Sequence, residues 1–149
     1  MTQKSTPPAA VREAILTESL ETLERSLTES PLAQELGIVF TEFEPGRATA
    51  RLPASPKLPN FLGYTHTGAV FALAEQVMAA AANSLGYVGL PLNCEIHFLK
   101  GADPGEALEA RARVVDTQGR IARVSVDVLQ GATEVARVTE MVFLRTGGA

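Results

Sequence analysis

Residues 60–76, NFLGYTHTGAVFALAEQ, decide the fold of this chain. They open with a turn that contains glycine and histidine and continue into an apolar run interrupted by one carboxylate, Glu75. Ala, Leu, Phe and Met dominate residues 67–85, and Gly86 follows as a helix stop signal. Apolar residues surround the whole axis of this segment, so we expect a buried helix over 67–85.

The segments on either side of that helix have the two-residue period of strands. Residues 38–44 and 47–52 flank Pro45-Gly46 and predict a hairpin. In the first strand Val39, Thr41 and Phe43 share a face, and in the second strand Ala48, Ala50 and Leu52 share a face. After the helix, alternating patterns predict four more strands, near 92–99, 106–115, 122–128 and 134–144. Because the turns between them are short, we expect neighbouring strands to be antiparallel.

The N-terminal part is of a different kind. Residues 1–8 have the composition of a disordered tail, and residues 9–29 carry apolar side chains at helical spacing up to the stop at Ser30-Pro31. Residues 9–149 are therefore expected to form one α+β domain. In that domain a curved antiparallel sheet wraps around the central helix, and an extra helix precedes it.

Composition excludes several classes of function. The chain has 149 residues, 46% of them hydrophobic and 20% charged, which is typical of a folded domain with a core. With a net charge of −4 and no basic patch, a nucleic-acid partner is not expected. The longest apolar run, about 69–82, is broken by Glu75 and Gln76, so no membrane span is expected either.

The cysteine and histidine content argues against a disulfide and against a metal site. One cysteine, Cys94, cannot form an intrachain disulfide, and no Cys/His cluster suggests a metal site. The N-terminus has no apolar core of a secretory signal. These observations fit a cytoplasmic protein that needs neither a metal nor a cofactor.

The arrangement of elements, together with residues 60–75, resembles the hotdog-fold thioesterase superfamily. The resemblance is greatest to the phenylacetate-pathway type of acyl-CoA thioesterase and its uncharacterised relatives. In that group an asparagine precedes a His-Gly-Gly-like turn by six residues, and an acid follows the histidine by nine. Here Asn60, His66 and Glu75 have these spacings, and Gly68 stands for the second glycine of the turn. The chain departs from the pattern at Thr67, which replaces the first glycine, and in having Glu as the acid.

The residues themselves support this chemistry. Burial raises the pKa of a carboxyl such as Glu75, which suits a general base, or a nucleophile, that attacks a thioester. The turn at Thr67 and Gly68 lies where free N–H groups at a helix N-terminus stabilise an oxyanion. Asn60 either contacts the water or carbonyl or only forms a local Asx-turn, and His66 either takes part or orients the turn. For each of these residues a purely structural role remains open.

Other expectations follow from the resemblance alone. It implies that Asn93, early in the strand after the helix, assists the acid. It also implies a homodimer, or a dimer of dimers, in which Asn60 and His66 of one copy face Glu75 of the other. The substrate would be an acyl-CoA or acyl-carrier thioester, and the basic side chains available for nucleotide phosphates are Lys57, Lys100, Arg120 and Arg123.

Three functions remain open on the sequence. The first is an acyl-CoA thioesterase that uses Glu75. The second is a hotdog protein that binds an acyl thioester without hydrolysing it. The third is a hotdog dehydratase or hydratase, which ranks last because the spacing from histidine to acid is usually longer in that class.

Overall fold

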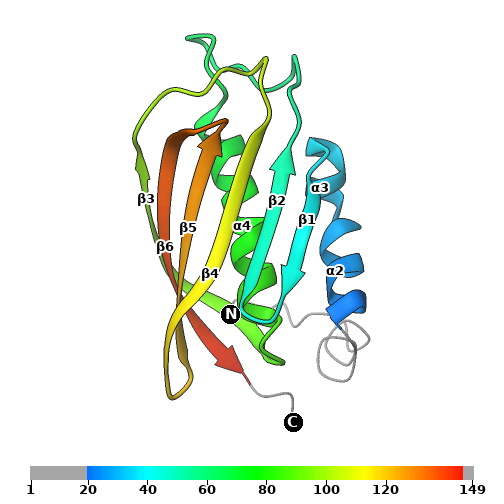
Figure 1. Cartoon of the computed structure of the whole chain (residues 1–149), viewed down its shortest axis with the longest axis vertical. Coiled ribbons are helices and arrows are strands. Elements are labelled where there is room, and N and C mark those ends of the chain that lie inside the picture. The colour runs from blue at the N-terminus through cyan, green and yellow to red at the C-terminus, as the bar shows by residue number, and fades with distance from the viewer. Residues whose placement is uncertain (1–19, 146–149) are drawn as a thin grey trace, which may run out of the picture.

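The computed structural model describes residues 20–145, and Figure 1 shows their arrangement. The predicted tail, 1–8, and the first part of the predicted helix, 9–19, lie outside the described residues. The elements in chain order are α2 (Leu20–Thr28), α3 (Pro31–Leu36), β1 (Val39–Glu44), β2 (Arg47–Leu52), α4 (Thr67–Asn83), β3 (Val88–Phe98), β4 (Leu108–Gln118), β5 (Ile121–Gln130) and β6 (Thr133–Arg145).

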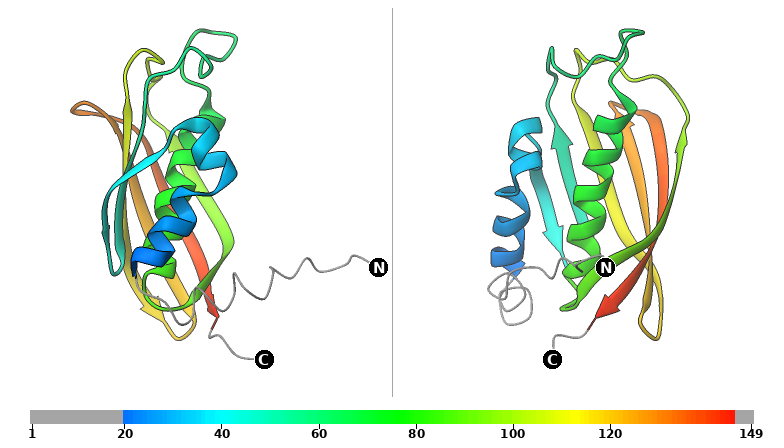
Figure 2. Two further views of the ribbon diagram at one scale, coloured as in Figure 1. Left: turned by 90° about the vertical axis from the view of Figure 1, so that its right-hand side faces the viewer. Right: turned by 180° about the vertical axis from the view of Figure 1, so that it is seen from behind.

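The six strands form one antiparallel sheet in the order β1-β2-β4-β5-β6-β3. The sheet curves around α4, and α2 lies beside α4 next to β1 (Figure 2). This confirms the predicted α+β hotdog architecture. No helix in residues 20–145 has the length and apolar character needed to cross a membrane.

Small apolar side chains fill the space between α4 and the sheet. The inward residues of β5 alternate strictly with outward ones and are fully buried, as are the core positions of α4. Alanine and valine predominate, so the sheet backbone approaches the helix closely and the core is built from many small contacts. The fully buried residues of these two elements are Leu73, Ala74, Val77, Met78, Ala122, Val124, Val126 and Val128.

The order of strands in the sheet does not follow their order in the chain throughout. β3 does not pair with β4, because the connection 99–107 carries the chain past the N-terminal end of α4, where Thr65 donates its N–H to the carbonyl of Ala102. β4 then pairs with β2, and β3 pairs only with β6. β3 is therefore left as an edge strand.

Two local details also differ from the sequence expectation. A register shift between Phe40 and Glu42 breaks the alternation of β1, so Phe40 and Phe43 pack inward and Val39 is exposed. The short helix α3 was not predicted. It has Pro31 in its first turn and ends at Gly37, whose φ of 72° is left-handed and suits glycine.

A buried hydroxyl joins the C-terminal end of α4 to the turn between β1 and β2. Ser84 Oγ accepts a hydrogen bond from the N–H of Gly46 (2.8 Å) and donates one to the carbonyl of Ala81 (2.7 Å). Because Ser84 is buried, water has little access to the Gly46 amide once this partner is lost.

We expect Ser84→Ala to lower the free energy of unfolding by about 1–3 kcal/mol, the cost of an unsatisfied buried donor. Urea unfolding measures this, with an unchanged m-value showing that the transition remains two-state. Ser125→Ala in β5 is the matched control, because its hydroxyl makes no hydrogen bond to any described residue. A Ser84→Ala variant as stable as the Ser125→Ala variant would contradict this role.

Candidate active site

The loop before α4 is held in shape by the side chain of Asn60. Its Oδ1 accepts hydrogen bonds from the backbone N–H groups of Leu62 (2.9 Å) and Tyr64 (3.2 Å). The oxygen therefore makes the Asx-type turn that the sequence left open as a structural role. The Nδ2 donors of Asn60 bond to no group among residues 20–145 and remain available to a ligand.

The N-cap of α4 is His66. The Nδ1 atom of His66 accepts a hydrogen bond from the Gly68 N–H at 2.9 Å, which makes Thr67 the first residue of the helix. Gly68 permits this because a Cβ there would lie only 3.0 Å from Nδ1. The residue is exposed, and the hydrogen bond that the structure shows for its ring is this capping contact.

This cap divides the two amides predicted to stabilise an oxyanion. The Gly68 N–H is occupied by His66, whereas the Thr67 N–H has no acceptor in the described part of the chain. The Thr67 amide therefore points its hydrogen away from the helix, where the helix dipole favours negative charge.

A cavity of about 290 Å³ lies at this N-terminus. Asn60, Thr65 and Thr67 line one side of it, and Lys100 lies on the connection 99–107 opposite. Thr65 is only 3% exposed, and its Oγ1 has no hydrogen-bond partner among the described residues. Apolar walls complete the cavity, namely Val70, Phe98, Leu99 and Val135.

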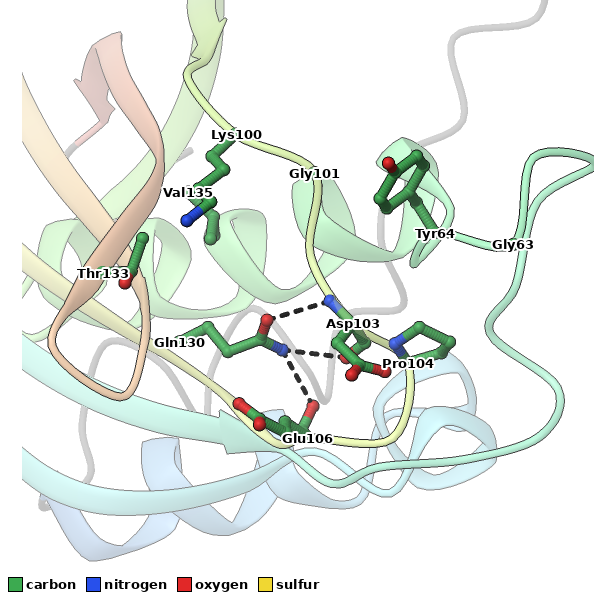
Figure 3. A pocket seen from close by; sticks show the side chains of 10 residues that line it. All are labelled: Gly63, Tyr64, Lys100, Gly101, Asp103, Pro104, Glu106, Gln130, Thr133 and Val135. Atoms are coloured by element: carbon green, nitrogen blue, oxygen red, sulfur yellow. Dashed lines mark hydrogen bonds between the residues drawn. The ribbon is translucent and has the colours of Figure 1, made fainter.

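A second cavity, of about 510 Å³, adjoins the first and shares Tyr64, Lys100, Gly101 and Val135 with it (Figure 3). The side chain of Gln130 braces its floor by bonding to the N–H of Asp103 and the carbonyls of Asp103 and Glu106. Gly101 lies against the Tyr64 ring, where a Cβ would come within 2.8 Å of the ring carbons. Of the four cations named from the sequence, Lys100 alone lines these two cavities.

Glu75 is two helical turns further along α4. At 1.5 Å per residue, its backbone lies about 12 Å from that of Thr67, so one chain does not bring Glu75 to the loop residues. The Glu75 side chain is half-buried, and this burial raises the pKa of its carboxyl above the ordinary value. The structure thus separates the predicted residues into two halves.

Two titratable groups on the sheet face Glu75. Glu140 of β6 lies on the inward face, 2% exposed, directly across from Cys94 of β3 in the strand register. Burial, then the charge of Glu75, raises the pKa of Glu140 to about 8. Burial, then the charges of Glu140 and Glu75, raises the pKa of the Cys94 thiol to about 11.

Sequence reasoning missed Glu140, although a signal for it was present. In the segment 134–144, Glu140 has the same phase as Ala136, Val138 and Val142, all of which are buried. A carboxylate in phase with three core residues of a strand faces the core. Cys94, directly across from Glu140, lies on the same inward face, but the chain by itself leaves it exposed.

Asn93 is not brought to Glu75 within this chain. Asn93 pairs with Met141, and the next residue, Cys94, pairs with Glu140. Because successive side chains of a strand point to opposite faces, Asn93 lies on the outer face of the sheet with Glu95 and His97. A register shift between Pro91 and Asn93 sets this phase. The inward position beside Glu75 belongs to Cys94. In residues 20–145 no three His, Cys, Asp or Glu side chains gather closely enough to hold a metal ion.

Comparisons with known proteins agree with this fold. The model of the thioesterase superfamily matches residues 62–136. The acyl-coenzyme A thioesterase PaaI of Escherichia coli K12 is 32% identical over 82 residues, which cover 55% of this chain and 59% of that protein. The chain spans only about three fifths of the length of the curated relatives it matches, 61% and 59%.

Solved structures show the same fold. A mutant of the phenylacetic acid degradation protein PaaI from Thermus thermophilus superposes with a TM-score of 0.74 at 28% identity, covering 78% of this chain and 99% of that one. A Streptococcus mutans UA159 protein bound to acetyl-CoA gives a TM-score of 0.70 at 26% identity, with coverages of 75% and 91%. Because the family model covers half of its length and the fold agrees, the chain belongs to the hotdog-fold thioesterase superfamily.

Proposed function

We propose that this protein is an acyl-CoA thioesterase with Glu75 as the catalytic carboxylate. The observation that carries the proposal is a half-buried glutamate, with a raised pKa, on the central helix of a thioesterase-superfamily chain. A similar protein binds acetyl-CoA and another is an acyl-CoA thioesterase, which supports this substrate class.

In the proposed hydrolysis, water is activated at Glu75. The Glu75 carboxylate takes a proton from water, and the water oxygen bonds to the thioester carbonyl carbon. The Thr67 N–H at the start of α4 stabilises the oxyanion that develops. The C–S bond then breaks, and the departing thiolate takes up the proton. Attack by the carboxylate itself, through an anhydride that water then cleaves, uses the same groups.

The separation of Glu75 from Thr67 supports a site shared between two copies. β3 is an edge strand of the described sheet, paired with β6 on one side and with no strand on the other. It carries the exposed apolar side chains Leu90, Leu92 and Phe98. A long exposed apolar edge of this kind is a site for pairing with another chain. Pairing of two β3 strands around a two-fold axis would place Glu75 of each copy near the loop 60–68 of the other. The native mass in solution tests this, because a strict monomer contradicts it.

One observation favours the alternative, a protein that binds acyl thioesters without turnover. The Gly68 N–H is already occupied by His66 Nδ1, so the oxyanion would have one amide of this pair instead of two. The loss of one such donor typically costs about 10²–10³-fold in kcat.

A panel of acyl-CoAs differing in chain length and ring content separates the two functions. Release of free thiol measures hydrolysis, and calorimetry measures binding. Hydrolysis of at least one member well above the uncatalysed rate supports the thioesterase. Binding throughout the panel with no thiol release would leave only the binding function.

Asn60→Asp separates the two roles of that residue. The acid keeps the acceptor oxygen that holds the loop, but it loses the Nδ2 donors and adds negative charge near the oxyanion. We expect thermal stability close to that of the wild type and a fall in kcat of about 10²-fold. Asn60→Ala, which removes both functions, is the comparison. Full activity in Asn60→Asp would show that Asn60 serves the loop alone.

A further inference from the structure

We propose that Glu140 is a positioning residue that holds a proton beside Glu75, so that Glu75 alone carries the negative charge of the site at neutral pH. This inference rests on the proposed function of Glu75. It concerns a buried carboxyl on β6 that the hydrolytic mechanism above does not use.

The location of Glu140 supports the role. In the strand register Glu140 lies between Val124 of β5 and Cys94 of β3, and all three side chains point toward α4. Glu140 is only 2% exposed. The sheet therefore presents a carboxyl to the helix side on which Glu75 lies, and does so in the middle of β6, away from the turns at the ends of that strand.

No counter-charge accompanies Glu140 in the part of the chain that the structure describes. The titratable groups that face it are Glu75 from α4 and Cys94 from β3, whereas β5 contributes the apolar Val124. Within residues 20–145 the Glu140 side chain makes no ion pair and accepts no hydrogen bond. An ionised carboxylate in such surroundings is strongly disfavoured, so Glu140 retains its proton.

The two carboxyls do not titrate alike. The pKa of Glu140 is raised to about 8 by burial and by the charge on Glu75, while burial alone accounts for the raised pKa of Glu75. Glu140 is 2% exposed whereas Glu75 is only half-buried, so burial opposes the charge of Glu140 more strongly, and a charge on Glu75 opposes it further. The Cys94 thiol, with a pKa of about 11, stays neutral throughout.

The order of ionisation affects the reaction. Between the pKa of Glu75 and a pH of about 8 the site holds one negative charge, on the base. At higher pH, ionisation of Glu140 adds a second charge, which repels the oxyanion that develops on the substrate. We expect kcat/KM of the wild type to fall at high pH, to about a tenth of its neutral value near pH 9.

Glu140→Gln tests the proposal, because an amide has the shape and donor capacity of the protonated acid but cannot ionise. The variant is expected to keep near-normal kcat/KM at neutral pH and to lose the decline that begins at a pH of about 8. Glu44→Gln, at an exposed position of β1, is the matched control and should keep the wild-type profile. A decline that persists unchanged in Glu140→Gln would overturn the proposal.

A second measurement does not depend on catalysis. Glutamate labelled with ¹³C at the carboxyl reports each titration by NMR, and the signal absent from Glu140→Gln identifies Glu140. Titration at a pH of about 8 supports the proposal, and titration near the ordinary glutamate value of 4.5 overturns it even if hydrolysis is observed. Conversely, a wild type that hydrolyses no acyl-CoA but shows the high titration would refute the thioesterase function and leave the proton on Glu140 in place.

Discussion

Glu75→Gln is expected to reduce kcat for the preferred acyl-CoA by about 10²–10⁴-fold, the range for loss of a general base. Glutamine occupies nearly the same volume, so the packing of α4 is preserved. Because burial disfavours the charged form of Glu75, its replacement by a neutral amide should leave the protein as stable as the wild type or more so.

Initial rates and thermal unfolding of the same preparations measure these effects. Substrate affinity should change little if Glu75 acts mainly in the transition state, so KM is the second readout. Glu44→Gln again controls for the loss of one exposed carboxylate. Activity of Glu75→Gln within a factor of about three of the wild type would exclude Glu75 as base or nucleophile.

The pH profile should also reveal Glu75. A general base works only when ionised, so activity should rise with pH through the pKa of Glu75. Since that pKa is raised by burial, the acidic limb should lie above the ordinary glutamate value of 4.5. Together with the decline assigned to Glu140, this predicts a bell-shaped curve with a high-pH limb at about 8.

Mixed dimers of two inactive variants are expected to recover activity. If each site combines the loop of one copy with Glu75 of the other, a dimer of one Asn60→Ala chain and one Glu75→Gln chain contains one intact site and one doubly altered site. Purified mixed dimers should therefore have about half of the wild-type activity, and an unfractionated random assembly, half of which is mixed, about a quarter.

Co-expression of the two variants with different affinity tags, followed by two-step purification of the mixed species, measures this recovery. Each variant alone and a mixture made after separate folding are the controls. Absence of recovery in purified mixed dimers would place all catalytic groups within one chain. That result would contradict the shared-site arrangement while leaving the role of Glu75 intact.

Local sequence patterns predicted most of the secondary structure. The apolar run after His66 indicated a helix to within two residues of its observed C-terminal end, and Pro45-Gly46 correctly located the first hairpin. These elements form where the chain's own periodicity and turn residues act over a few neighbours. The apolar pattern did not identify the cap residue, because the cap depends on the bond from the Gly68 N–H to His66 Nδ1.

Positions that depend on distant partners were harder to infer. The antiparallel direction of the strands was predicted correctly, but the partner of β3 was not predicted, since the sequence of the connection 99–107 does not reveal that it crosses the end of α4. Asn93 and Cys94 alternate in sequence, and the pairing of Cys94 with buried Glu140 is what brings a carboxyl beside the inward one of the two. The phase of Glu140 with core residues can be read from the sequence, but its position near Glu75 is known only from the packing of β6 in the structure.

The sequence by itself determined that a buried helix bearing Glu75 lies within an antiparallel sheet, because helical and strand periods are local properties of the chain. The tertiary structure decided which groups share the space around that carboxylate. Glu75, Cys94 and Glu140 come from three elements that are separate in sequence, and their effects on one another's ionisation arise only when folding brings them together around the buried carboxyl of Glu140.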